Sequence, residues 1–267
     1  IARVFRPGIK FEVMLCLVGG QGAGKSTFFR FLAMKDDWFT DDLKKMDDEN
    51  VYRKLQGHLI VEFPEMVAIL NAKNVEDTKS FMSRQKDTYK TPYDKHPKDH
   101  KRQCVFAGSS NSLDFLPMDR SGNRRFLPIQ CNVNEAEVHI LDDEKVSREY
   151  IAQMWAEAME IYRSGNYMLK LPKKTQEELC EYQKRFMQED TKKELILDYL
   201  EHCKGNMVCS RLLYAEALGN DGSPAQWEIR EINDIMNNCS GWIAFTNPRY
   251  FPSPYNRQRG WEKPDNK

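Results

Sequence analysis

The chain has 267 residues, and its 40 basic and 40 acidic residues cancel to a formal net charge of zero. That length suits one large and one small domain without covalent staples, and the zero net charge excludes nucleic-acid affinity that rests on overall charge. The seven cysteines include no Cys-x-x-Cys pair, which predicts a reduced protein without structural zinc. No apolar run approaches the ~20 residues of a membrane span and no signal peptide is visible, so we expect a cytoplasmic protein with no membrane partner.

A glycine-rich motif stands between the first predicted strand and the first predicted helix. The apolar run at 13–18 reads as a buried strand, and the run at 28–33 reads as a helix. Between them lies a match to the phosphate-binding pattern G-x-x-x-x-G-K-[ST], made of Gly19, Gly20, Gln21, Gly22, Ala23, Gly24, Lys25, Ser26 and Thr27. We therefore expect ATP and Mg²⁺ as cofactors, with Lys25 on the β- and γ-phosphates and Ser26 as a metal ligand.

Two carboxylates surround the end of the second predicted strand. An acidic, partly helical stretch at 35–57 leads into this strand at 58–63, and a helical pattern follows at 65–86. An acid at the tip of the strand beside a phosphate loop holds Mg²⁺, and a second carboxylate polarises the attacking water. Glu62 is placed for the metal and Glu65 for the water, although the two roles are interchangeable. Alternatively, Glu65 only caps the helix that begins there.

An amide and two arginines complete the candidate catalytic set. Asn111 follows the third predicted strand, at 104–108, where it can bond a γ-phosphate oxygen and the lytic water, or else only its own turn. Arg124 and Arg125 follow a Ser-Gly-Asn turn, from which either can reach the γ-phosphate of a neighbouring subunit. The alternative for these arginines is pairing with surface carboxylates such as Asp114 or Asp119.

Residues 79–102 offer a candidate contact for nucleic acid. They hold eight Lys or Arg against three Asp, and the interleaved rings are Tyr89, Tyr93, His96 and His100. Because cations neutralise phosphates and rings stack on bases, residues 87–102 are expected to form a polar loop that contacts single-stranded DNA. The alternative is a solvated loop of mixed charge.

The pattern after Pro128 is mostly helical. Helices are predicted at 147–164 and 175–188, the second one charged and exposed on most sides, and a domain boundary is predicted near residue 190. The domain at 191–267 reads as three helices (191–203, 209–217 and 224–238) with short strands around 242–245 and a terminal β-ribbon, which favours a winged helix. The basic and aromatic stretch at 249–261 is either a wing on DNA or a tail packed on its own domain.

Taken in order, these segments resemble the virulence-associated protein E family of phages and mobile islands. The resemblance rests on 7–27, 57–66, 79–84, 102–111 and 122–126, covers about residues 7–130, and returns at 255–261. That family is similar to superfamily 3 helicases and poxvirus-type primase-helicases, which usually carry two adjacent acids where this chain has Glu62-Phe63-Pro64-Glu65.

The resemblance implies a fold and a function. The fold would be an AAA+-like α/β P-loop core with a mostly parallel sheet at 1–190, followed by the helical domain. The function would be a DNA helicase or translocase ATPase that forms a ring, such as a hexamer, on single-stranded or forked DNA during replication of a mobile element. Because the sequence begins at Ile1, an upstream segment is expected, and the resemblance implies that it holds a primase or other module. The alternatives are an ATP-dependent origin- or partner-binding switch and a P-loop nucleotide or polynucleotide kinase.

Overall fold

The computed structural model describes residues 1–43, 51–70, 75–117 and 123–264. The chain divides into two compact units, Ile1–Gln188 and Glu189–Lys267, and this division falls close to residue 190. Several sequence predictions lie outside the described residues: part of the acidic stretch at 44–50, the middle of the predicted helix 65–86, and the turn with Asp119, Ser121 and Gly122. No described helix is long and apolar enough to cross a membrane.

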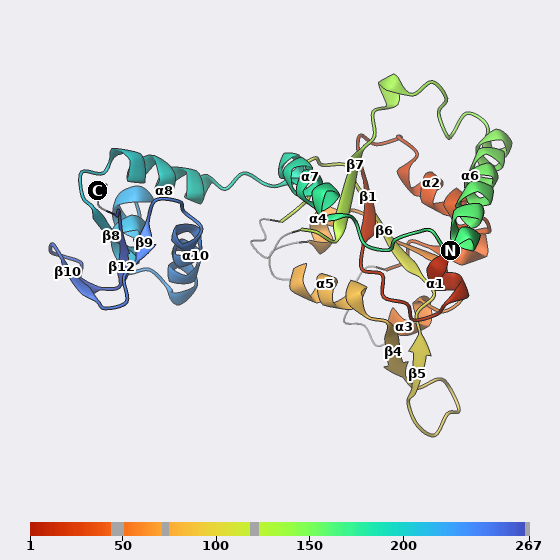
Figure 1. The fold of residues 1–267 in the computed structure, drawn as a ribbon, viewed down its shortest axis with the longest axis horizontal. Coiled ribbons are helices and arrows are strands. Elements are labelled where there is room, and N and C mark those ends of the chain that lie inside the picture. Colours follow the sequence, from red (N-terminus) through yellow and green to blue (C-terminus); the bar gives the residue numbers. More distant parts are fainter. Residues whose placement is uncertain (44–50, 71–74, 118–122, 265–267) are drawn as a thin grey trace. The chain divides into compact units, whose positions relative to one another are not determined.

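A five-stranded parallel sheet forms the centre of the first unit (Figure 1). Its order is β2-β3-β6-β1-β7, with bounds Phe39–Thr40, Ile60–Phe63, Val105–Ser110, Met14–Val18 and Phe126–Gln130. Cys16 in β1 lies opposite Gly108 of β6 on one side and Pro128 of β7 on the other. The three predicted strands and the predicted parallel sheet are therefore confirmed, whereas β2 and β7 were not predicted as strands.

Helices surround this sheet. They are α1 Ala2–Phe5, α2 Lys25–Leu32, α3 Val51–Lys54, α4 Met66–Ile69, α5 Val75–Ser83, α6 Glu144–Ser164 and α7 Lys173–Gln183, with 3₁₀ turns at Asp36–Trp38, Val133–Glu135 and Lys184–Phe186. In Figure 1, α6 runs beside α2, and Trp155 donates to the Leu32 carbonyl at 2.9 Å. The α6 helix begins before the predicted residue 147 because Asp143 caps it, accepting from the Val146 amide.

The expectation that the helix at 175–188 is exposed on most sides is wrong at its carboxyl end. Gln183 is buried and donates to the carbonyls of Asn123 and Phe126, and Phe186 is buried in the core beneath the sheet. These bonds explain the burial of a polar side chain, because an amide that satisfies main-chain acceptors loses little by leaving water.

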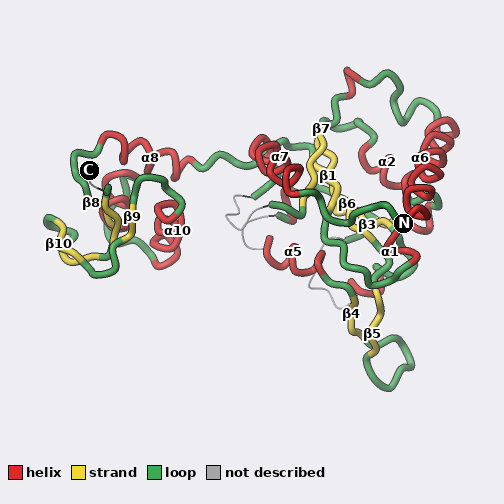
Figure 2. The backbone as a smooth tube through the Cα atoms, viewed as in Figure 1, coloured by secondary structure: helices red, strands yellow, loops and turns green. Residues whose placement is uncertain are grey.

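The predicted loop at 87–102 is in fact a β-hairpin. The strands β4 (Lys86–Tyr89) and β5 (Lys98–Lys101) pair antiparallel, and Figure 2 shows them carrying a loop away from the sheet. The base of the hairpin is held by a buried ion pair in which Arg102 donates to both oxygens of Asp87, at 2.5 and 2.7 Å. The Arg102 guanidinium also lies 4.4 Å from the centre of the Phe81 ring. Arg102 and Asp87 therefore connect the hairpin to the core.

The second unit has its own apolar core and its own sheet. Its elements are α8 Thr191–His202, β8 Met207–Cys209, α9 Ser210–Leu212 continued by a π turn to Ala217, α10 Gln226–Asn237, β9 Ile243–Ala244, β10 Arg249–Phe251, β11 Asn256–Gln258 and β12 Gly260–Glu262. The strands β8, β12 and β9 form an antiparallel sheet in that order, and β10 pairs with β11. Assignment as a winged helix stays a prediction.

Removal of the buried Arg102–Asp87 pair should destabilise the first unit. Arg102→Ala leaves the Asp87 carboxylate buried without its cation, so the free energy of unfolding should fall by about 3–5 kcal/mol. Urea unfolding measures this loss. The control Lys98→Ala removes an exposed hairpin pair with Asp94 and should cost only about 0–1 kcal/mol. Equal losses in the two variants would show that the buried pair does not hold the hairpin.

Candidate functional site

The glycine-rich segment lies between β1 and α2, and its backbone conformation requires glycine at two places. Gly22 and Gly24 have φ of +84° and +71°, a region that other residues rarely adopt. A Cβ on Gly24 would also lie 2.3 Å from the Ile140 side chain. Gly24 is the N-cap of α2 and supplies no side-chain cap, so the first backbone N–H groups of α2 remain available to an anion.

Lys25 lies at the base of this loop. Its ammonium donates to the carbonyls of Gly19 and Gly20, at 2.7 and 2.9 Å, and to Asn111 Oδ1 at 2.9 Å. Burial lowers the pKa of Lys25, an effect opposed by Cys131 and Glu62. The structure thus brings together two residues that are 86 positions apart, the predicted phosphate lysine and the predicted sensor amide.

Glu62 is the buried acid of the site. Its side chain has no exposed surface, and its Oε1 accepts from Ser26 Oγ at 2.7 Å and from Ser109 Oγ at 2.6 Å. Its Oε2 is buried and, among the described residues, bonds to nothing. Burial raises the pKa of Glu62, opposed by the two serine hydroxyls and more weakly by Lys25. Ser109 was not among the predicted site residues, although it lies in β6, two residues before Asn111.

The donor set around Glu62 fits a hard cation. A carboxylate oxygen without a partner and a serine hydroxyl are oxygen ligands of the kind that Mg²⁺ takes, with water and phosphate in its remaining positions. The described ranges contain no cluster of three or more His, Cys, Asp or Glu that could hold a metal alone. Ser26 and Glu62 would therefore need a phosphate ligand to complete a Mg²⁺ site.

Glu65 faces the same cavity from the opposite wall. This cavity of ≈ 360 Å³ is lined by the loop residues Gln21 to Thr27, by Pro64 and Glu65, by Ser109, Ser110 and Asn111, and by Leu141. Glu65 is exposed and adopts φ +54°, an uncommon conformation for a residue other than glycine. It is the N-cap of α4, yet its side chain makes no capping bond. The alternative that Glu65 merely caps the helix is therefore not supported.

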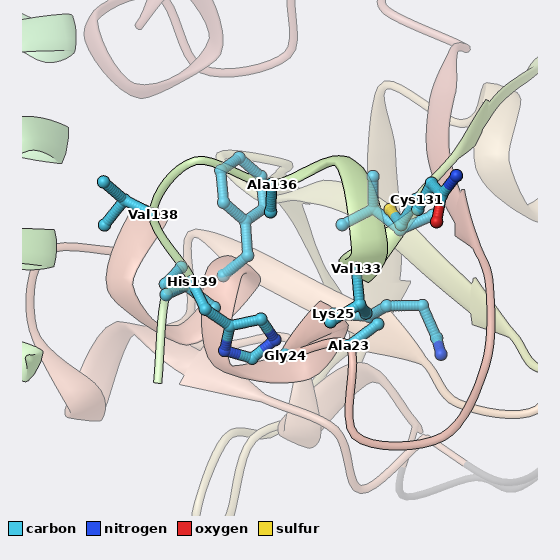
Figure 3. Close-up of a pocket in the computed structure, with 12 residues that line it drawn as sticks. Ala23, Gly24, Lys25, Cys131, Val133, Ala136, Val138 and His139 are labelled. Carbon is cyan, nitrogen blue, oxygen red and sulfur yellow. The ribbon is translucent and has the colours of Figure 1, made fainter. Parts of the chain in front are cut away.

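A second cavity, which was not predicted, lies on the other side of the phosphate loop (Figure 3). It measures ≈ 300 Å³ and is lined by Leu17, Ala23, Gly24, Lys25, Phe28, Cys131, Asn132, Val133, Ala136, Val138, His139 and Ile140. Figure 3 shows the segment from Cys131 to His139 arching beside the loop residues Ala23 and Gly24. The sequence indicates this cavity only through scattered apolar residues in 129–140. Their spacing matches neither a helix nor a strand, so the cavity could not be predicted from them.

Arg124 and Arg125 lie at the amino-terminal ends of the strands, opposite the end that carries the glycine-rich loop. The Arg125 carbonyl accepts from the Met14 amide, at the start of β1, whereas the phosphate loop follows the end of the same strand. Neither arginine can reach the phosphate loop of its own chain. Both pair with a carboxylate, as the alternative expected, but the partner is Glu12, at 3.7 Å from Arg124 and 3.9 Å from Arg125, and not Asp114. The other named carboxylate, Asp119, lies outside the described residues.

The two arginines differ in exposure. The Arg124 side chain is 66% exposed, whereas that of Arg125 is 19% exposed and donates to Ser83 Oγ at 3.0 Å. Both border a cavity of ≈ 320 Å³ that Lys10 and Lys170 also line. Arg124 is therefore the arginine available to an external anion, and Arg125 has a packing role.

The hairpin loop between β4 and β5 is exposed. Tyr93 is fully exposed there, and Lys90, Lys95 and His96 are exposed as well. The acids nearby are already paired, Asp94 with Lys98 and Asp99 with Lys86. The surface left at the loop is therefore basic and aromatic, as predicted for these residues.

Replacement of the buried acid should stabilise the protein in the absence of metal. A carboxyl whose pKa is raised by burial contributes stability while protonated, and this contribution is lost as the pH rises through the folded pKa. In Mg²⁺-free buffer, Glu62→Gln should therefore have a higher melting temperature than the natural protein at pH 7.5. The difference should shrink as the pH is lowered toward 4.5. A difference that is independent of pH would contradict the assignment of a costly buried charge.

Residues 1–188, which make up the whole first unit, match the family model described as the virulence-associated protein E-like domain. Two solved structures are among the matches to this chain. The apo C-terminal region of NrS-1, residues 305–718, has 16% identity, covers 98% of this chain and 69% of that one, and has a TM-score of 0.49. A second structure of that region has 17% identity, covers 94% and 67%, and has the same TM-score.

No curated protein matches the chain. The family match extends well beyond the phosphate loop and includes the strand with Glu62, the strand before Asn111 and the two arginines. It confirms the resemblance drawn from the sequence. The chain therefore belongs to the virulence-associated protein E-like domain family.

Proposed function

We propose that the first unit is a Mg²⁺-dependent ATPase. The observation that carries the proposal is the cluster in which Lys25 contacts Asn111 while Ser26 and Ser109 contact Glu62, all beside one cavity of ≈ 360 Å³. An ammonium ion, a free helix N-terminus and a buried carboxylate are the groups that phosphoryl transfer to water needs.

Each side chain then has a distinct role. Lys25 would exchange its carbonyl partners for the β- and γ-phosphates, because an anion is a stronger acceptor than a carbonyl. Ser26 and Glu62 would hold Mg²⁺, which neutralises charge on the phosphates when bound. Glu65 is exposed in the cavity and would orient the attacking water together with Asn111. Direct contact of Glu62 with Ser26 favours Glu62 over Glu65 as the metal acid.

The apolar cavity beside the loop is the candidate site for the nucleobase. It adjoins the phosphate loop, shares Ala23, Gly24 and Lys25 with the phosphate cavity, and is walled by aliphatic and aromatic side chains. A purine ring needs such walls for its faces and a few polar atoms at its edge, which Asn132 and His139 would supply.

The position of Arg124 supports a site that is shared between subunits. Arg124 is exposed at the edge opposite the phosphate loop, so it would act on the nucleotide of a second copy, in a ring such as a hexamer. Membership of the family supports action on single-stranded or forked DNA during replication of a phage or other mobile element, in concert with an upstream primase-like module.

A mixing experiment tests both the ATPase and its shared site. Lys25→Ala should abolish hydrolysis, and Arg124→Ala should lower kcat by about 10³-fold or more. An equal mixture of the two variants should regain activity, because roughly a quarter of random interfaces pair an intact phosphate loop with an intact Arg124. Phosphate release against protein concentration is the measurement. The matched control Arg163→Ala, an exposed arginine on α6, should leave the rate unchanged.

Three other outcomes separate the rivals. A natural protein that binds ATP tightly without turnover would favour the binding switch. A rate per chain that does not depend on protein concentration or DNA would favour a monomeric kinase. Two inactive variants whose mixture also stays inactive would rule out a site completed by Arg124 in trans.

The exposed hairpin loop is the candidate DNA contact of this unit. Lys95→Ala with His96→Ala removes two basic groups that no described residue pairs. DNA-stimulated hydrolysis should fall several-fold while hydrolysis without DNA is retained, because these residues lie outside both cavities. The control is Lys173→Ala with Lys174→Ala on α7, whose side chains are also exposed. Equal loss of basal and stimulated rates would remove this role.

A further inference from the structure

The basic and aromatic stretch at 249–261 divides into a packed part and an exposed part. Phe251 and Trp261 are buried in the core of the second unit, and Tyr255 donates to Glu216 at 2.8 Å. Arg249 forms a two-pronged ion pair with Glu262. For these four residues, the interpretation as a tail packed on its own domain is correct.

Tyr250 and Arg257 lie on the outer face of the β10–β11 ribbon, and Arg259 directly follows β11. Tyr250 pairs across the ribbon with Arg257, and because side chains alternate along a strand, both point away from the face that buries Phe251. Tyr250 is 76% exposed, and Arg257 and Arg259 are exposed. Neither arginine makes an ion pair with a described residue, and the one bond of Arg257 goes from its Nε to the Pro248 carbonyl at 3.3 Å.

Charge is segregated along the second unit. Residues 189–267 hold more acidic than basic side chains, yet no Asp or Glu occurs between Asp234 and Glu262. The ribbon therefore presents guanidinium groups without neighbouring carboxylates in its own sequence. Such segregation produces a local positive surface on a unit that would otherwise repel a polyanion.

In the order of elements along the second unit, two consecutive helices precede this ribbon. The helical segment 210–217 and α10 are consecutive helices joined by residues 218–225, and the ribbon connects β9 to β12 beside β8. Two consecutive helices of this kind present the amino end of the second helix to a DNA groove. That end of α10 carries exposed Gln226, Trp227 and Arg230, which can donate to base edges or phosphates.

We infer that the second unit binds duplex DNA, with Arg257 and Arg259 on backbone phosphates and α10 at a groove. Duplex is favoured over single strand because the outer face of the ribbon carries one ring, Tyr250, whereas single-strand sites use successive rings to stack successive bases. The inference goes beyond the proposed ATPase function, because it needs neither nucleotide nor the first unit's cavities.

The test compares two double variants of the whole 267-residue chain. Arg257→Ala with Arg259→Ala removes the ribbon cations, and Lys193→Ala with Lys204→Ala removes two exposed cations elsewhere in the same unit. Fluorescence anisotropy with a 30-base-pair duplex and with the same-length single strand, without ATP and over a series of salt concentrations, gives the affinities. The ribbon variant should lose roughly tenfold in duplex affinity, and its slope of log K against log salt should become less negative by about 2.

Several outcomes would decide the matter. Arg257→Lys with Arg259→Lys should retain duplex binding, and all variants should keep the natural melting temperature and DNA-free ATP hydrolysis. Equal duplex binding by the ribbon variant and the lysine control would overturn the inference, and so would a loss confined to the single strand. Since Lys25→Ala should leave duplex binding intact, failure of the ATPase proposal would be seen separately.

Discussion

The site depends on the burial of one carboxylate, Glu62, at the carboxyl ends of the strands of a parallel sheet. In the protein interior a charge is costly unless it is compensated, and Glu62 is compensated only on one oxygen, by two serine hydroxyls. The sheet places it there because β3, β6 and β1 are parallel and adjacent, so their carboxyl ends deliver Glu62, Ser109 and the phosphate loop to one edge. The remaining cost is the reason to expect a cation at this edge.

Much of this edge was predictable from sequence. Three short apolar runs, each followed by glycine or polar residues, predict buried strands, and parallel strands bring their ends together whatever the intervening loops do. Lys25, Ser26, Glu65 and Asn111 follow such strands, and the structure places these four around one cavity, where Glu62, inside its strand, contacts Ser26. The sequence did not give the strand order: the strand with Glu62 was expected beside β1, but β6, which precedes Asn111, lies between them and brings Asn111 to Lys25.

The parts that sequence reasoning missed depend on long-range partners. Residues 87–102 are polar enough for a loop, but Asp87 and Arg102 pair in the interior and convert the segment into a hairpin. Ser109 lacked a signal because its role depends on which neighbour lies across the strand. The choice between Arg124 and Arg125 could not be made from adjacent identical residues, since it rests on Ser83, some forty positions earlier, which holds only one of them.

The phosphate loop and Arg124 lie at opposite ends of the same sheet. In the proposed assembly, one chain would thus supply its loop to one interface and its Arg124 to the other. If sites are completed by neighbours, an open row of such chains has one fewer complete site than it has members, and an isolated chain has none. Closing the row into a ring completes the last site without a new contact type, so the hydrolysis rate per chain would rise as rows lengthen and reach its maximum on closure.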